Sequence, residues 1–319
     1  SHLPENILTN ADIEKLCDTN DEWIRKRTGI EQRHVISPGQ GSSDLALPAA
    51  QEALDNAGMS PEEIDIIVFC TVTPDQLVPA SASLLQGKLG AVNAAAFDVN
   101  AACSGFINGL AVADALLQSG KYANVLLVGA EVQSNRMLWN HRDTAILFAD
   151  GAGAWVLQGV DPEEGGSAVL TTHLHSDGAS HEILHLPRGG SREVFTVDNF
   201  DEDAYRIHMN GPELFKRAVT QFVDVCHEAL EAAGITMDEV NLFVPHQANK
   251  RIIEAAGERM GIDPEKVAIT IEKTGNTTAA SIPIALHQAH KDGRLKKGDY
   301  VLLAAFGAGL TWASAVVRW

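Results

Sequence analysis

The sequence predicts an internally duplicated α/β fold in which helices cover the faces of two sheets. A twenty-residue segment that begins at Gln51, QEALDNAGMSPEEIDIIVFC, recurs 176 residues later at His227 as HEALEAAGITMDEVNLFVPH, with seven identities. The same offset aligns KYANVLLVG with KGDYVLLAA and Asn100 with Asn276, so the register holds over about 80 residues. Helical and strand patterns alternate in both halves, as in layered α/β proteins. These observations indicate an ancient duplication.

The individual elements follow from periodicity and from helix-ending signals. An amphipathic helix at Leu45–Ala57 ends at Gly58, and the apolar, β-branched run Ile64–Thr71 is typical of a buried strand. The first half also contains a strand at Ala94–Val99, a helix from about Gly105 to Ser119 and a strand at Val125–Gly129. The second half contains a helix that ends at Ala233, strand Asn241–Val244, helix Arg251–Met260, strand Val267–Ile271, helix Thr277–His290, and strands Tyr300–Ala305 and Trp312–Arg318.

The stretch between the two halves, residues 162–210, is polar, contains glycine and is less periodic than its flanks. It fits either an excursion that covers a site or a surface loop. We therefore expect two halves, residues 1–162 and 163–319, with the excursion at about 163–210 in the second.

Charge and cysteine content limit the class of protein. The chain has 319 residues and a formal net charge of −18. A nucleic-acid binder is therefore disfavoured, and an acidic partner needs a local basic patch. The four cysteines have no zinc-site spacing, no apolar run reaches membrane-spanning length, and no signal-peptide pattern is visible. We expect reduced thiols in a cytoplasmic protein, with no metal and no nucleic-acid or membrane partner.

Cys103, in DVNAACSGFINGLAVA, lies where a strand pattern passes into a helix pattern. A thiol near a helix N-terminus is favoured as a thiolate by the macrodipole and by free N–H groups. The small residues Ser104 and Gly105 allow a sharp turn and the approach of a substrate. A buried structural cysteine is the alternative. That structural role is expected for the cysteines inside helix or strand patterns, which are Cys17, Cys70 and Cys226.

His246 and Asn276 each follow a predicted strand, where ligand sites of α/β sheets gather. A pseudo-twofold axis could bring both to Cys103. A capping or core histidine and a helix N-cap asparagine are the alternatives. The turn Gly307–Gly309 could direct backbone N–H groups at an oxyanion. A similar turn, DGAGA, begins at Asp150 in the other half, so the internal duplication alone could also explain why glycine occurs in both turns.

Seven motifs in order resemble β-ketoacyl-acyl-carrier-protein synthase III. They are DEWIRKRTGI at Asp21–Ile30, NAACSGF at Asn100–Phe106, LFADGAGA at Leu147–Ala154, HLHSDG at His173–Gly178, VPHQANKRI at Val244–Ile252, GNTTAAS at Gly275–Ser281 and FGAGLTWASAVVRW at Phe306–Trp319. The resemblance covers essentially the whole chain. It implies a thiolase-like, internally duplicated fold with α-β-α-β-α layers and two mixed sheets, which agrees with the repeat.

The resemblance also implies a condensing enzyme that starts fatty acid synthesis. Cys103 would take an acyl group from acyl-CoA as a covalent thioester. A malonyl group on acyl carrier protein would then lose CO₂, and the enolate would attack that thioester. His246 and Asn276 would donate hydrogen bonds to the malonyl thioester oxygen, and the backbone N–H groups of Cys103 and Ala308 would form a second oxyanion hole. No cofactor is implied, since acyl-CoA and malonyl carrier protein are substrates.

Other matching positions imply binding surfaces and a homodimer. Trp23, Arg27 and Arg142 match positions that bind the CoA nucleotide, although Trp23 alone fits a helix-face aromatic residue. Arg251 matches a basic position that receives the acidic carrier protein. Lys250 and Arg259 either extend that patch or lie on a solvated helix face.

The sequence departs from the family pattern at several points. Val78 stands where the acetyl-selective type has Phe, near the acyl pocket of the dimer partner, so we expect longer or branched primers. Ala308 replaces a common glycine, and Glu258 replaces a basic residue of the docking helix. The segment Arg188–Arg206 is longer than in many members, and the family's first strand would precede residue 1.

Three alternatives stay open at this point. The first is a condensing enzyme of the same fold in secondary metabolism, for example in quinolone or polyketide priming. The second is a cysteine thioester hydrolase that uses Cys103 and His246, and the third is a non-catalytic acyl-binding protein.

Overall fold

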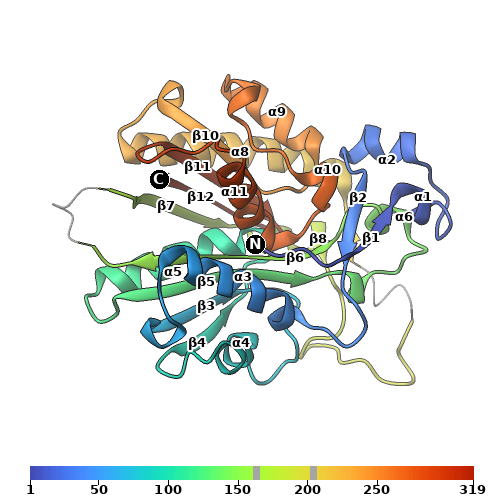
Figure 1. Ribbon diagram of the computed structural model, residues 1–319. Helices are drawn as coiled ribbons and strands as arrows, with labels where there is room; N and C mark the ends of the chain where they lie inside the picture. The colour runs from blue at the N-terminus through green and yellow to red at the C-terminus, as the bar shows by residue number, and fades with distance from the viewer. Residues whose placement is uncertain (161–165, 202–206) are drawn as a thin grey trace.

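The computed structural model describes residues 1–160, 166–201 and 207–319, and two four-stranded sheets form its framework (Figure 1). The first has the strand order β4-β3-β5-β6 and the second β10-β11-β12-β7. Their strands are β3 (Ile66–Cys70), β4 (Ala95–Val99), β5 (Asn124–Val132), β6 (Asp150–Gln158), β7 (Ala168–Ser176), β10 (Val240–Pro245), β11 (Tyr300–Gly307) and β12 (Thr311–Arg318). Each sheet combines parallel and antiparallel pairs, which confirms the predicted class of two mixed sheets.

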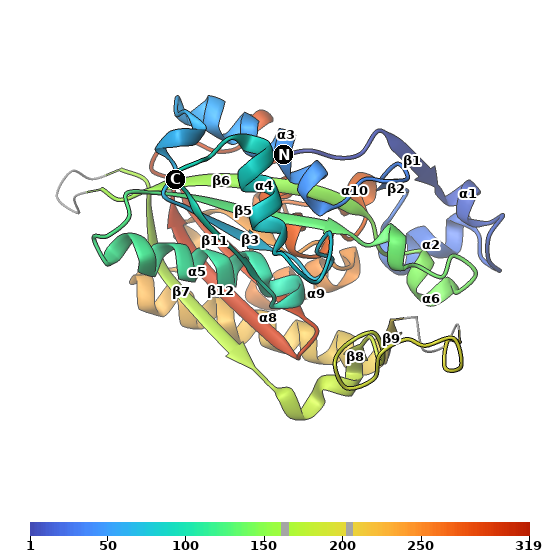
Figure 2. The ribbon, with the colours of Figure 1, turned by 90° about the horizontal axis from the view of Figure 1, so that it is seen from below.

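Helices form three layers around these sheets. They are α3 (Ser42–Ala57), α4 (Ser81–Leu89), α5 (Gly105–Gln118), α8 (Gly211–Ala233), α9 (Lys250–Met260) and α11 (Ser281–Lys291). One apolar core joins α3 and α4 to the outer face of the first sheet, and another joins α8 and α9 to the second. A third core, which contains side chains of α5 and α11, fills the space between the sheets. Figures 1 and 2 show the resulting five layers.

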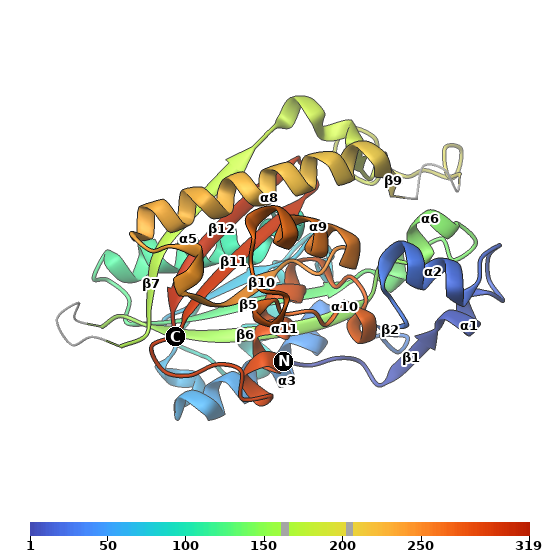
Figure 3. The ribbon, with the colours of Figure 1, turned by 90° about the horizontal axis from the view of Figure 1, so that it is seen from above.

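Shorter elements complete the described chain. They are β1 (Asn6–Thr9), α1 (Asn10–Ile13), α2 (Asp21–Thr28), β2 (Gln32–Val35), α6 (Arg142–Ala145), β8 (Leu184–His185), β9 (His208–Met209) and α10 (Ile271–Thr274). The β8–β9 pair lies at the N-terminal end of α8 (Figure 3). Among the described residues, no helix combines the length and apolarity needed to cross a bilayer.

The repeat in the sequence corresponds to a repeat in local structure. Helices α3 and α8 both end at a left-handed glycine, Gly58 and Gly234, a conformation that glycine adopts without steric cost. A capping box then follows each helix, with Ser60 in the first copy and Thr236 in the second. Each box starts a short 3₁₀ turn that leads into a buried strand, β3 or β10. Equivalent sequence signals therefore produce equivalent helix–turn–strand units.

The prediction of a strand at Val267–Ile271 was wrong. Only Val267 makes an isolated parallel bridge, to Phe243 of β10, and Ile271 already begins α10. The side chain of Gln247 replaces the missing ladder, because it accepts from the backbone N–H of Ile271 at 3.2 Å and donates to a neighbouring carbonyl at 3.1 Å. A side chain that satisfies these backbone groups removes the need for strand pairing.

A further strand, β7, lies within the stretch that was assigned to the excursion. It pairs with β12 alone and is only partly buried, so its alternation of apolar and polar residues is weak. The proposed boundary at residue 162 and the end of the longer segment at Arg206 lie outside the described residues. The division into two halves at that boundary stays a prediction.

Close packing between α5 and the first sheet gives the first testable prediction. A Cβ atom at Gly109 would lie 2.3 Å from the Cys70 sulfur and 2.8 Å from Leu127 Cδ1. Gly109→Ala is therefore expected to lower the free energy of unfolding by about 1–3 kcal/mol through overpacking. Gly87→Ala in α4 is the matched control, because a Cβ there meets nothing within 4 Å, and it should raise stability by about 0.5–1 kcal/mol. Urea unfolding measures both, and equal effects would contradict the packing described here.

Candidate active site

Cys103 lies in the turn η2 (Ala102–Ser104), between β4 and α5. The preceding Ala102 has φ +47°, a left-handed conformation that is unfavourable for a residue with a Cβ atom. Ser104 holds the turn in place, since its hydroxyl contacts the Ala101 carbonyl oxygen at 2.8 Å and the Thr311 hydroxyl at 2.9 Å. The turn thus fixes Cys103 at the start of α5, where the sequence predicted it.

The end of β11 packs directly against this cysteine. A Cβ atom at Gly307 would lie 2.6 Å from Cys103 Cβ and 3.1 Å from its sulfur, so only glycine allows the approach. The backbone N–H groups of Ala308 and of Cys103 itself lie close enough to the sulfur to lower its pKa. The two N–H groups that the resemblance implies for an oxyanion hole are therefore both near the reactive atom.

The protonation state of Cys103 differs from the expectation. Burial raises the pKa of the thiol to about 12, helped by the nearby carboxylate of Glu131, and these two effects outweigh the two N–H groups. The thiolate expected from the helix terminus is therefore not the resting form, because desolvation disfavours the charged state more strongly.

His246 follows β10 and is buried, with 1% of its surface exposed. Its Nδ1 lies 2.6 Å from the hydroxyl of Ser281, which also accepts from the backbone N–H of Gln247 at 3.2 Å. Burial lowers the pKa of His246 to about 3, so the ring is neutral and carries one proton. When the Ser281 hydroxyl donates to Nδ1, as it can while it accepts from Gln247, the imidazole proton lies on Nε2. That Nε2 is buried and has no hydrogen-bond partner among the described residues.

Asn276 is held by backbone and side chain together. Its N–H donates to the Leu147 carbonyl and its carbonyl accepts from the Ala149 N–H, both at 2.9 Å. Its Oδ1 accepts from the backbone N–H of Thr278 at 2.9 Å. Since the oxygen of the carboxamide is engaged, the Nδ2 group is the one left to donate to a ligand.

The turn η8 (Thr278–Ala280) connects the three predicted catalytic side chains. It begins two residues after Asn276, and Ser281 directly after it contacts His246. It also packs on the segment of Cys103, because a Cβ atom at Gly105 would lie 3.4 Å from the Cβ of Ala279. The structure therefore brings the segments of the thiol, the imidazole and the carboxamide together around one buried turn.

The three residues predicted to bind the CoA nucleotide also cluster. The guanidinium of Arg142, in α6, lies 4.6 Å from the ring centroid of Trp23, and that of Arg27 lies 5.5 Å from it. Both distances are in the range of cation–π contacts. An aromatic face flanked by two cations suits a nucleotide base with its phosphates.

The basic residues predicted for docking all lie on α9 but differ in their contacts. Lys250 is ion-paired with Glu272 at 2.6 Å, so its charge is largely compensated. Arg251 is exposed, and its guanidinium lies 5.5 Å from the ring of Phe215. Arg259 is also exposed, at the other end of the helix. Glu258 lies on the same exposed side.

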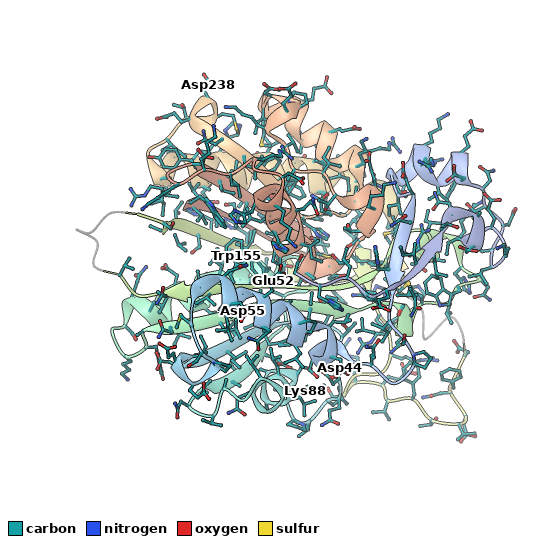
Figure 4. All side chains as sticks on the ribbon, in the orientation of Figure 1. Asp44, Glu52, Asp55, Lys88, Trp155 and Asp238 are labelled. Carbon is teal, nitrogen blue, oxygen red and sulfur yellow. The ribbon has the colours of Figure 1, made fainter. Side chains whose placement is uncertain are left out.

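Val78 is 84% exposed in the loop before α4, so it lines no buried pocket of its own chain. A cavity of about 790 Å³ lies elsewhere, beside α3, β6 and α11. Glu52 and Trp155, which both line it, mark its position in Figure 4. None of the predicted site residues lines this cavity. A smaller cavity of about 150 Å³ is lined in part by His141, the residue that precedes Arg142 in the sequence.

Sequence reasoning missed two buried polar residues next to the site. Ser281 lies inside the GNTTAAS motif and orients His246. Glu131 is a single acidic residue within the apolar run NVLLVGAEV, and this isolation was the available signal.

Two copies of a helix–turn–strand unit, with the segments of a thiol, an imidazole and a carboxamide gathered around one buried turn, define a thiolase-like condensing enzyme. Two family models match the chain, 3-oxoacyl-(acyl-carrier-protein) synthase III over residues 97–178 and its C-terminal model over residues 230–319. The chain belongs to the β-ketoacyl-acyl-carrier-protein synthase III family.

Known relatives support this membership over the full length. A β-ketoacyl-acyl-carrier-protein synthase III of Caldanaerobacter subterraneus is 48% identical over 319 residues, which is 100% of this chain and 96% of the relative. The crystal structure of 3-oxoacyl-acyl-carrier-protein synthase III from Aquifex aeolicus matches with a TM-score of 0.91 and 45% identity, covering 100% of this chain and 97% of that chain. The priming β-ketosynthase of the R1128 polyketide pathway matches with a TM-score of 0.91 and 33% identity, and the match covers 99% of this chain and 93% of that chain.

Alkylation of Cys103 tests its protonation state. We expect the rate with iodoacetamide to keep rising through about pH 10, because the pKa of the thiol is raised to about 12. Mass analysis of the Cys103 peptide measures the rate, and N-acetylcysteine is the reference, whose rate should be half-maximal near the ordinary cysteine pKa of about 8.5 and level off above it. A plateau near neutral pH would instead support the thiolate that the helix terminus suggests.

Proposed function

We propose that the chain loads an acyl group from acyl-CoA onto Cys103 and condenses it decarboxylatively with malonyl-acyl-carrier protein, the step that initiates fatty acid synthesis. The observation that supports this proposal is the junction at η8, where the segment of one buried thiol packs beside two side chains that can donate but do not bear charge. A condensation needs this set, because negative charge develops first on one thioester oxygen and then on another.

In the loading step, the Cys103 sulfur attacks the carbonyl carbon of acyl-CoA. The bond from that carbon to the CoA sulfur breaks, and the thiol proton leaves with CoA. The N–H groups of Cys103 and Ala308 would stabilise the tetrahedral oxyanion, which forms on the carbonyl oxygen next to the attacking sulfur, because both N–H groups lie close to that sulfur. Nucleophilic attack by sulfur on a thioester exchanges one thioester for another.

In the condensation step, the malonyl thioester loses CO₂ and its electron pair forms an enolate. Nε2–H of His246 and Nδ2–H of Asn276 donate to the enolate oxygen. The carbanion attacks the acyl carbon on Cys103, the carbon–sulfur bond breaks, and the sulfur leaves as a thiolate that takes up a proton. The product is a β-ketoacyl thioester on the carrier protein.

The buried, neutral His246 favours condensation over hydrolysis. A cysteine thioester hydrolase needs a histidine that accepts a proton near pH 7, but burial lowers the pKa of this imidazole to about 3. Its Nδ1 is also engaged by Ser281. The second candidate is a condensing enzyme of secondary metabolism, favoured by the likeness to the R1128 priming β-ketosynthase; the same chemistry would then serve a different carrier protein.

The proposal extends to the partners. The CoA nucleotide would stack on Trp23 between Arg27 and Arg142, and no cofactor takes part since both thioesters are substrates. The acidic carrier protein would dock at Arg251, with Arg259 and the partly compensated Lys250 at either side. A second copy of the chain would bring its Val78 to the acyl pocket. A cytoplasmic location stays a prediction from cysteine content.

Intact-mass analysis with a series of acyl-CoAs tests the proposed function. We expect one acyl group per chain, lost in Cys103→Ala. His246→Ala and Asn276→Ala should still load but should slow decarboxylation of malonyl-acyl-carrier protein about 10²–10³-fold, because each removes one donor from the enolate oxygen. Equal loss of loading and condensation in these two variants would contradict the separation of roles. Full condensation by Cys103→Ala would end the proposal.

Primer choice tests the position assigned to Val78. We expect wild type to accept acyl-CoAs longer or more branched than acetyl, and Val78→Phe to narrow the choice, because a phenyl ring fills the end of the acyl pocket. The measurement is kcat/KM across acyl-CoA lengths, and Val92→Phe, also on the exposed surface at 72% exposure, is the control. A steep preference of the wild type for acetyl-CoA would reject the prediction.

A further inference from the structure

A buried carboxylate lies beside the proposed catalytic groups without taking part in the chemistry. Glu131, in β5, is 0% exposed. Burying a carboxylate is costly unless several donors satisfy it, and burial raises the pKa of this one to about 7. Because burial of this carboxylate destabilises the fold, we asked what the carboxylate contributes beside the reactive cysteine.

Every contact of this carboxylate comes from a hydrogen-bond donor. Thr73 Oγ1 lies at 2.5 Å, the Val72 N–H at 3.2 Å from both oxygens, and Thr71 Oγ1 at 3.3 Å. The backbone amide of Ala279 lies close enough to lower the pKa of the same carboxyl group. The three donors come from the segment after β3, and Ala279 lies in η8. The carboxylate therefore joins the end of the first sheet to the turn that links the proposed catalytic side chains.

The residues around Glu131 contact the same turn. Two positions before it, a Cβ atom at Gly129 would lie 2.8 Å from the carbonyl oxygen of Ala279. Two positions after it, Gln133 Nε2 donates to Thr278 Oγ1 at 2.9 Å. Alternate residues of a strand share one face, so one face of β5 and its extension holds η8 from three points. Of these three residues, Glu131 alone has an ionisable side chain.

The position of η8 affects the orientation of His246 and Asn276, the two donors of the proposed condensation. The N–H of Thr278 donates to the carboxamide oxygen of Asn276, and the Ser281 hydroxyl contacts Nδ1 of His246. A turn displaced by a fraction of an ångström would misdirect both. We propose that Glu131 is a positioning residue, whose buried carboxylate holds η8 so that His246 and Asn276 point at the malonyl thioester.

This inference rests on the proposed function and predicts a separation of its two steps. Loading depends on Cys103 and its backbone N–H groups, whereas condensation depends on the donors that η8 aligns. Glu131→Gln keeps the shape but turns an NH₂ group toward donors. We expect it to load Cys103 at a rate within about twofold of wild type and to slow condensation about 10–100-fold, with KM for acyl-CoA unchanged. Glu131→Asp, which keeps the charge with a shorter reach, should recover part of the loss.

A second readout separates positioning from a general loss of structure. The carboxylate raises the pKa of the Cys103 thiol, and among the described residues it also raises that of the Cys70 thiol on β3. The pH profile of Cys103 alkylation should therefore move to lower pH in Glu131→Gln and stay in place in Glu131→Asp. Asp150→Asn is the matched control. Asp150 is an equally buried carboxylate that caps the Ser134 and Ile36 N–H groups instead of η8, and its variant should keep the wild-type ratio of condensation to loading.

The outcomes are distinguishable from failure of the proposed function. If wild type does not load Cys103, the proposed function fails. If wild type loads and condenses but Glu131→Gln condenses equally well, or loses both steps in proportion, the positioning role is overturned. Should Glu131→Gln not fold, Thr73→Val removes the closest donor with little change of shape. It should lower the ratio of condensation to loading by about threefold to tenfold, and an unchanged ratio would overturn the inference.

Discussion

One buried turn, η8, holds every side chain of the proposed chemistry in place. Its backbone fixes the carboxamide of Asn276, the residue that follows it fixes the ring of His246, and its methyl group at Ala279 packs on the helix that Cys103 precedes. The turn contacts β5 of the first sheet, and Ser281 directly after it contacts His246 at the end of β10 in the second sheet. The site is thus a product of the packing between the two copies rather than of either copy.

Burial gives this site its electrostatic character. The same desolvation raises the pKa of the Cys103 thiol and lowers that of the His246 imidazole, and both groups are therefore neutral. A neutral imidazole with its proton on Nε2 is a donor rather than a base, which suits an enolate oxygen and does not suit activation of water. Fixed hydrogen-bond donors stabilise the negative charge that develops during the reaction. Because the site is buried, each of these hydrogen bonds stabilises the charge more than it would in water.

The sequence allowed the duplication, most of the strands and helices, and the three residues at the junction to be predicted, because the repeat keeps its register and because motifs mark the turns. It could not show that Gln247 replaces a strand at Val267, since this depends on where one amide side chain reaches. It also pointed to a Cys103 thiolate, because the helix terminus is visible in sequence and the depth of burial is not. Ser281 and Glu131 were missed because their roles arise from contacts across 35 residues and more.

The most direct test of the central claim is a crystal structure of the chain acylated on Cys103, with a non-hydrolysable malonyl thioester analogue bound. The account predicts that Nε2 of His246 and Nδ2 of Asn276 both lie within about 3.2 Å of the analogue's thioester oxygen. It also predicts that the N–H groups of Cys103 and Ala308 contact the acyl oxygen. An analogue oxygen held by water or by other residues, with the two donors turned away, would contradict it.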